Sequence, residues 1–187
     1  MGLTPLAGVP MGTRSGDIDA AVVQFICNKY GYSVDECLNM LNKKSGMLAV
    51  SGVSSDFRDL EDGAKNGNED CALARDKFCY EVAKYVGAYA AALNGIDVLT
   101  FTAGVGENDC AVRADVCKYL EFMGVKIDAE LNKARGKELC ISTPDSKVVE
   151  HFAFRIEYDG TADDGARLAR LTFCLLSNGQ EAFKGSA

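Results

Sequence analysis

A glycine turn between a strand pattern and a helix pattern constrains the fold of this chain most. Residues 96–101 are largely apolar, residues 102–108 read TAGVGEN, and apolar side chains then recur at helical spacing in residues 112–120. This order predicts a strand, a tight turn and the start of a helix. The backbone N–H groups at a helix start bind anions, so the turn is a candidate phosphate site.

The same turn fits neither of two common nucleotide motifs. The stretch Gly104-Val105-Gly106 lacks the third glycine of a dinucleotide fingerprint and the Lys-Ser/Thr pair of a P-loop. The alternative is that these glycines simply join a strand to a helix.

A second glycine loop, residues 11–17 (MGTRSGD), carries a cation. Arg14 lies between Gly12 and Gly16, so the backbone can approach a ligand closely while the guanidinium offers a fork of donors to phosphate oxygens. This arrangement suits phosphoryl transfer. The alternative is an ordinary turn whose Asp17 caps the helix that follows.

The tripeptide Asp56-Phe57-Arg58 combines a carboxylate, an aromatic ring and a cation. These groups could bind a ribose hydroxyl, stack on a base and neutralise charge, respectively. Because Ser54 and Ser55 come just before, the alternative is a helix cap with a local charge pair.

Other ionisable residues are less specific. Mg²⁺ takes only one or two carboxylates plus phosphate oxygens, so several acidic residues are equal candidates: Glu107, Asp109, Asp163 and Asp164. His151, the only histidine, has no metal-ligand spacing to any cysteine, and we interpret it as structural or exposed.

Composition narrows the class of protein. The 187 residues, 48% of them hydrophobic, suffice for one main domain, and the formal charge of −7 argues against nucleic-acid binding. Eight scattered cysteines without a Cys-x-x-Cys pair predict reduced, mostly buried thiols and a cytoplasmic location. No apolar stretch approaches the roughly 20 residues of a membrane span, and no export signal precedes the chain, so we expect no membrane contact.

Helix and strand patterns alternate, which predicts an α/β fold. Helices are expected after Asp17, from Ser33 with Glu36 three positions on, and over about 25 residues from residue 69. Small residues along this long helix predict a buried central element and a surface for self-association. The remaining expectations are an extended segment at 47–53, strands at 125–128 and 139–142, a weak helix at 129–134, helical spacing at 168–176 and disorder at 177–187.

Five sequence blocks, taken in order, resemble the acetate kinase family. They are residues 11–19 (MGTRSGDID), 41–46 (LNKKSG), 51–59 (SGVSSDFRD), 101–108 (FTAGVGEN) and 141–146 (ISTPDS). The resemblance runs almost without gaps from residue 1 to about residue 148.

The resemblance implies a fold and a reaction. It implies the ribonuclease H-like α/β fold of the sugar kinase, Hsp70 and actin superfamily, a mixed sheet with flanking helices. Two related domains of that superfamily face each other across a cleft, and residues 1–149 resemble the carboxyl-terminal, nucleotide-binding one. The implied reaction converts ATP and acetate to ADP and acetyl phosphate with Mg²⁺, in a cytoplasmic homodimer.

The resemblance also implies roles for residues. Arg14 would stabilise the phosphoryl group in flight. The residues that would contact the nucleotide are Asp56, Phe57, Arg58, Gly104, Val105, Gly106, Glu107 and Asn108. Ungapped counting places Glu157 at the glutamate that helps the family to position Mg²⁺, but the residues around Glu157 do not match.

Two departures limit the resemblance. The amino-terminal domain of the family, with its acetate pocket and catalytic carboxylate, has no counterpart here, so we expect this chain alone to be inactive. Residues 150–187 form a divergent tail, and the sharp end of the match near Val149 suggests a change of reading frame. The alternatives are a propionate kinase, a non-catalytic nucleotide-binding or interaction module, and a truncated product.

Overall fold

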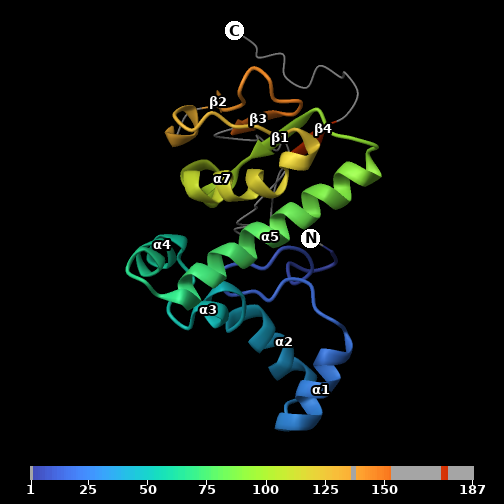
Figure 1. Cartoon of the computed structure of the whole chain (residues 1–187). Coiled ribbons are helices and arrows are strands. Elements are labelled where there is room, and N and C mark those ends of the chain that lie inside the picture. Colours follow the sequence, from blue (N-terminus) through green and yellow to red (C-terminus); the bar gives the residue numbers. More distant parts are fainter. Residues whose placement is uncertain (1, 136–137, 153–173, 177–187) are drawn as a thin grey trace, which may run out of the picture. The chain divides into compact units, whose positions relative to one another are not determined.

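The computed structural model describes residues 2–135, 138–152 and 174–176 (Figure 1). Its contacts divide the chain into two compact units, Met1–Val82 and Ala83–Ala187, called unit 1 and unit 2 below. The long helix α5 (Glu69–Ala92) contributes residues to both units, so the expectation of one main domain stays a prediction.

Unit 1 is helical in its described residues. Before α5 it contains α1 (Ala21–Tyr30), α2 (Val34–Lys43), α3 (Gly46–Ser51) and α4 (Phe57–Lys65). The predicted start of α2 is confirmed, because the Ser33 hydroxyl accepts from the N–H of Glu36 and the Glu36 carboxylate accepts from the N–H of Ser33. This capping box pairs two N–H groups that the helix start would otherwise leave free.

Two local predictions for unit 1 are wrong. Residues 47–53 are not extended, because α3 occupies most of them and ends at Gly52, which has a left-handed φ of 64°. Asp17 does not cap α1, since its Oδ1 accepts a hydrogen bond from the N–H of Gly8 at 2.7 Å. The residue at the start of α1 is Ala20, which offers no capping side chain. A loop contact has therefore displaced the local cap.

The predicted long helix is confirmed in length and only partly in burial. α5 has 24 residues, and Phe78, Val82 and Val86 of the expected stripe are buried. Further along the same stripe, Tyr89 and Leu93 are 51% and 37% exposed. In the described part of the chain, no helix combines the length and the apolar character that a bilayer crossing requires.

Unit 2 contains a mixed sheet with the strand order β2-β3-β1-β4. The strands are β1 (Val98–Phe101), β2 (Leu139–Cys140), β3 (Val149–Phe152) and β4 (Cys174–Leu176). β1 runs parallel to β3, with Val98 opposite Val149, and antiparallel to β4. His151 lies in β3, opposite Thr100 and Cys140. Strands and helices occur together in this unit, in agreement with the predicted α/β class.

Short helices follow β1 along the chain. They are α6 (Ala103–Asn108), α7 (Cys110–Tyr119) and the 3₁₀ turns η1 (Glu121–Met123) and η2 (Leu131–Lys133). The spacing that predicted a helix here is confirmed, because Val112, Val116 and Leu120 are all buried.

The later elements are shorter than predicted. The strand expected at 125–128 is reduced to one bridge between Ile127 and Ser142, the strand at 139–142 to β2, and the weak helix to η2. Residues 174–176 form β4, so helical spacing was the wrong interpretation there. The other tail positions, including residues 177–187, lie outside the described residues.

Candidate functional site

The loop that carries Arg14 is held in unit 1 by backbone hydrogen bonds. The N–H of Met11 donates to the carbonyl of Arg14 at 3.0 Å, which closes a tight turn. The end of α2 binds the next residues, because the N–H of Ser15 donates to Leu41 O and the Thr13 hydroxyl donates to Asn42 O, both at 3.0 Å. The turn at Arg14 is therefore fixed by the helix that precedes α3.

α3 binds the same loop from its first turn. The N–H of Met47 donates to Met11 O at 2.9 Å, and the N–H of Leu48 donates to Gly12 O at 2.8 Å. These are two of the N–H groups that a helix start leaves without partners inside the helix. Here they hold the loop, so a carbonyl takes the place that an anion could occupy.

Gly46 allows this close approach. Its φ is +61°, and a Cβ atom at this position would lie 2.0 Å from Met11 O and 2.6 Å from Arg14 O. Any other residue would displace the Arg14 loop or α3. Sequence reasoning missed this role, although Gly46 belongs to a quoted block; the signal was a glycine after Ser45 at a helix start.

The Arg14 side chain remains available for a ligand. It is half-buried, and its Nη1 donates to Met11 Sδ at 3.4 Å, a weak acceptor. Among the described residues it has no carboxylate partner. A guanidinium in this state can form its charge-assisted hydrogen bonds with a bound anion.

Asp56, Phe57 and Arg58 follow the cap pattern that was the alternative interpretation. Asp56 is the N-cap of α4, and its carboxylate accepts from the N–H of Arg58 at 2.9 Å and from the Arg58 guanidinium at 3.0 and 2.6 Å. The hydrogen bonds from Arg58 lower the pKa of Asp56 to about 2. The Asp56 carboxylate is therefore ionised at every physiological pH.

The Phe57 ring belongs to the packing of unit 1. It meets the buried ring of Phe78 edge-on, with ring centroids 4.7 Å apart. The Phe57 carbonyl accepts from Arg75 at 3.1 Å. The Arg14 loop lies beside the residue that precedes this tripeptide, because a Cβ atom at Gly12 would lie 2.9 Å from Ser55 O. Unit 1 thus brings Arg14 and the segment of Asp56 to Arg58 into one neighbourhood.

The segment of Gly104 to Asn108 is a helix and not an open loop. The chain leaves β1 at Phe101, and Ala103 has a positive φ of 61° that turns it into α6. Gly106 is buried, and a Cβ atom on it would lie 3.2 Å from the Phe101 carbonyl carbon, so the close packing of α6 on β1 requires glycine here. The predicted strand and helix are confirmed, and the tight turn is a single residue.

The outer side of α6 is open. Gly104 is exposed, and a Cβ atom there would meet nothing within 4 Å. Asn108 is also exposed, and its amide donates to Gly104 O at 2.9 Å. On the inner side, Glu107 accepts from the Thr102 hydroxyl at 3.5 Å.

A buried guanidinium holds the end of α6. Arg113, on α7, is 0% exposed, and its Nη1 donates to the carbonyls of Gly106 at 2.8 Å and Glu107 at 3.0 Å. Its Nε donates to Asn132 Oδ1 at 2.7 Å, and its Nη2 donates to the carbonyls of Asn132 and Ala134. Burial lowers the pKa of Arg113, but an arginine stays charged in proteins.

Sequence reasoning did not single out Arg113. The available signal was a charged residue beside Val112 in the apolar stripe of α7. Buried arginines are rare unless every donor is satisfied, and here carbonyls from α6 and η2 satisfy them. The carbonyls of Gly106 and Glu107 are fixed by side-chain donors that come later in the chain.

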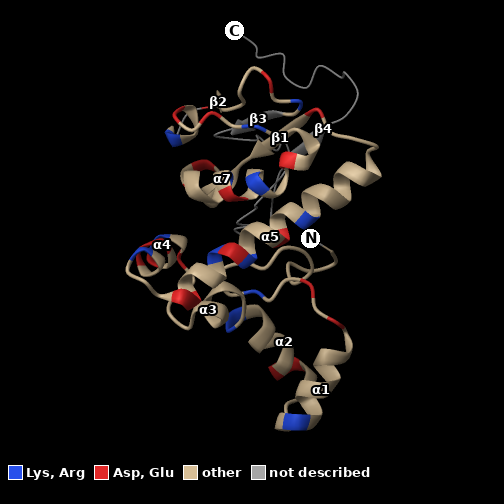
Figure 2. Ribbon diagram, in the orientation of Figure 1, with Lys and Arg blue, Asp and Glu red and all other residues tan. Residues whose placement is uncertain are grey.

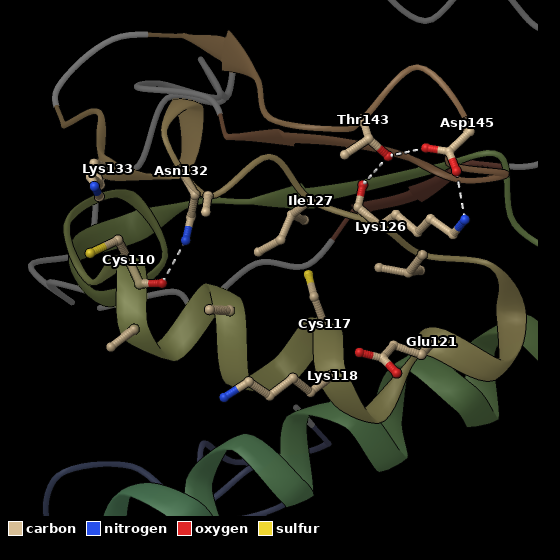
Figure 3. A pocket seen from close by; sticks show the side chains of 14 residues that line it. Cys110, Cys117, Lys118, Glu121, Lys126, Ile127, Asn132, Lys133, Thr143 and Asp145 are labelled. Carbon is tan, nitrogen blue, oxygen red and sulfur yellow. Dashed lines mark hydrogen bonds and ion pairs between the residues drawn. The ribbon is translucent and has the colours of Figure 1, made fainter.

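A cavity lies beside α7 in unit 2 (Figure 3). Its volume is about 830 Å³, and its walls come from α7, η2 and the segment between residues 125 and 145. Its three lysines each pair with a carboxylate: Lys118 with Asp115, Lys126 with Asp145 and Lys133 with Glu130. None of the residues predicted for the site lines this cavity.

The cavity wall is connected to the Arg113 network. Asn132 lines the cavity, donates from Nδ2 to Cys110 O at 2.8 Å, and accepts from Arg113 on its Oδ1 (Figure 3). The cavity and α6 therefore share one set of hydrogen bonds.

Metal candidates have no support from geometry. Within the described residues, no three His, Cys, Asp or Glu side chains gather where they could bind a metal ion. Glu157, Asp163 and Asp164 lie outside the described residues.

Replacing Arg113 tests its role in holding α6. We expect Arg113→Met to lower the free energy of unfolding by about 2–4 kcal/mol, because buried carbonyls of α6 and η2 lose their donors. Lys118→Met on the same helix should change it by less than about 1 kcal/mol, since its ion pair is exposed. Urea unfolding followed by circular dichroism measures both; equal effects of the two substitutions would contradict this role.

Comparison with known proteins was informative over most of the chain. The family model described as the Acetokinase family matches residues 1–157. The acetate kinase of Lachnoclostridium phytofermentans is 60% identical over 148 residues, which cover 79% of this chain and 38% of the relative. The acetate kinase of Carboxydothermus hydrogenoformans is 61% identical over 148 residues, again 79% of this chain and 37% of the relative.

Crystal structures agree with the sequence comparison. Porphyromonas gingivalis acetate kinase superimposes with a TM-score of 0.79 at 51% identity, covering 82% of this chain and 39% of that one. A propionate kinase from Francisella tularensis subsp. tularensis gives 0.77 at 38% identity over 82% of this chain and 39% of that one. The chain thus has the fold of this part of such kinases and spans less than two fifths of the length of the curated relatives it matches.

Proposed function

The chain belongs to the acetokinase family, and we propose that it is the nucleotide-binding portion of an acetate kinase-like phosphotransferase, which transfers a phosphoryl group between ATP and acetate. The observation that carries the proposal is the Arg14 guanidinium, half-buried on a fixed loop and without a carboxylate partner among the described residues. Phosphoryl transfer depends on such positioned positive charge.

Arg14 is the proposed catalytic residue. Its loop is fixed by hydrogen bonds from Met47 and Leu48, so the guanidinium is presented without reorganisation. Two or more of its donors can contact oxygens of the transferring group, where negative charge is spread.

The nucleotide residues belong to α4 and α6. The Arg58 side chain is 87% exposed and can contact phosphates while Asp56 keeps it oriented. On α6, the open space over Gly104 and the exposed Asn108 support contact of Gly104, Val105, Gly106, Glu107 and Asn108 with adenosine or phosphates. Phe57 is the least suited of these residues, because its ring packs on Phe78.

Mg²⁺ is proposed to accompany the nucleotide. In phosphoryl-transfer sites this ion takes one or two carboxylates and otherwise phosphate oxygens and water, so a cluster of three protein ligands is not required. Its chemistry would be to neutralise charge on the phosphates. Glu157 stays the predicted carboxylate.

The extent of the domain is part of the proposal. We assign residues 1–149 to a ribonuclease H-like nucleotide-binding domain and residues 150–187 to a divergent tail, with support from the 148 matched residues. The free cysteines among the described residues support a reducing compartment, the cytoplasm.

A propionate kinase is the second candidate. The superposition on the Francisella tularensis propionate kinase favours it almost as strongly as acetate kinase, with TM-scores of 0.77 and 0.79. The choice between the two acids would depend on the acyl pocket of the missing part.

Reconstitution tests the function. The purified chain, mixed with the amino-terminal part of the Lachnoclostridium phytofermentans acetate kinase, should form ADP from ATP only when acetate or propionate is added. Arg14→Ala should lower this rate by about 100-fold or more, because a donor to the transferring group is lost. A coupled assay for ADP measures the rate.

Controls separate the outcomes. Lys133→Ala, at the exposed rim of the α7 cavity, should leave the rate unchanged. Acid-dependent ADP formation by the chain alone would overturn the expected inactivity. Saturable ADP binding without turnover in the mixture would favour the non-catalytic nucleotide-binding module.

A homodimer is proposed through α1 and α2. Phe25, Tyr30 and Val34 are 61%, 59% and 57% exposed, and the α1 ribbon carries charge only near one end (Figure 2). On the predicted α5 surface, Ala83 and Ala90 are already buried within the chain. Apolar side chains gathered on one exposed face mark protein contacts.

Sedimentation equilibrium checks the homodimer. Phe25→Asp should raise the dissociation constant at least about tenfold, because a central apolar contact acquires a charge. Phe122→Asp, at a position 80% exposed on η1, is the matched control and should leave it unchanged. A monomeric wild-type chain, or equal effects of both substitutions, would rule out this surface.

A further inference from the structure

Two cysteines face each other between α1 and α2. Cys27 is on α1 and Cys37 is on α2, and their thiols are hydrogen bonded to each other. The two helices lie next to each other along the chain and in space (Figure 1). The contact joins two thiols of unit 1 and is independent of the nucleotide site.

The helix hairpin explains the contact. α1 ends at Tyr30, Gly31 turns the chain with a left-handed φ of 69°, and α2 starts after its cap at Ser33. Cys27 precedes this turn by nearly the same number of residues by which Cys37 follows it. In two packed helices joined by a short turn, positions equally far from the turn lie opposite each other.

The surroundings give the two thiols different access. Cys37 is 0% exposed, and burial together with the neighbouring Cys27 raises its pKa. Cys27 is only half-buried, so a small reagent can reach it. The accessible thiol would react first and the buried thiol second.

We propose that Cys27 and Cys37 form an intramolecular disulfide when a low-molecular-weight disulfide such as oxidised glutathione is present. The Cys27 thiolate attacks one sulfur of glutathione disulfide, forms a mixed disulfide and releases one glutathione. The Cys37 thiolate then attacks the Cys27 sulfur and releases the second glutathione. The two cysteines lose two electrons and two protons, which the two glutathione molecules carry away.

The disulfide would connect α1 firmly to the rest of unit 1. α1 has no buried residue, so little apolar packing holds it. α2 is anchored through buried Cys37 and Leu41, and its last turn binds the Arg14 loop through Leu41 O and Asn42 O. A covalent link between the helices removes conformations of the open hairpin.

Peptide mapping tests the proposal directly. Trypsin cleaves after Arg14, Lys29 and Lys43, so the two cysteines fall in separate peptides, 15–29 and 30–43. The native chain is incubated with oxidised glutathione, its remaining thiols are blocked in denaturant, and the digest is analysed without reductant. We expect the 15–29 and 30–43 peptides as one disulfide-linked species, with the free thiols falling from eight to six.

Single substitutions define the order of reaction. Cys37→Ser should stop at glutathione bound to Cys27, and Cys27→Ser should leave Cys37 largely unmodified. Cys110→Ser, which removes another half-buried thiol in unit 2, should preserve the linked peptides.

Hydrogen exchange measures the consequence for α1. In the oxidised chain the α1 amides should exchange at least about tenfold more slowly than in the reduced chain, because the hairpin opens less often. Complete modification of Cys27 by glutathione without release of the second glutathione would overturn the proposal. Linkage of either cysteine to a different partner would do the same.

Discussion

The buried guanidinium of Arg113 is the interaction on which the candidate nucleotide site of unit 2 depends. Its donors bind carbonyls of α6 and η2, and the Asn132 side chain completes the network. The cost of burying a charge is offset only when all donors are satisfied, so α6 and η2 have to adopt these positions together. The backbone of Gly106 and Glu107 is thereby fixed before any ligand arrives.

Unit 1 solves the same problem without a buried charge. The Arg14 loop is fixed by N–H groups of α3 and carbonyls of α2, and Gly46 provides the space for their approach. The charged group stays at the edge of this assembly, half-buried and able to bind an anion. In both units a rigid backbone arrangement carries the proposed contact residue, which is what electrostatic stabilisation of a transferring phosphoryl group requires.

Features determined by local sequence could be predicted, and features determined by distant contacts could not. The Ser33 capping box and the length of α5 were predicted because their signals lie within a few residues or repeat along one helix. The helical state of α3 depends on loop carbonyls far away in the sequence, and the displaced Asp17 cap depends on Gly8. Arg113 was missed because its partners at residues 132 and 134 are recognisable only in the folded chain.

The most direct test of this account is amide NMR of the ¹⁵N-labelled chain titrated with ADP. The account predicts saturable shifts at Gly104, Val105 and Gly106, where α6 is open to solvent on one side and held by Arg113 on the other. Shifts confined to the cavity residues between Cys110 and Lys133, or the absence of any saturable shift, would contradict it.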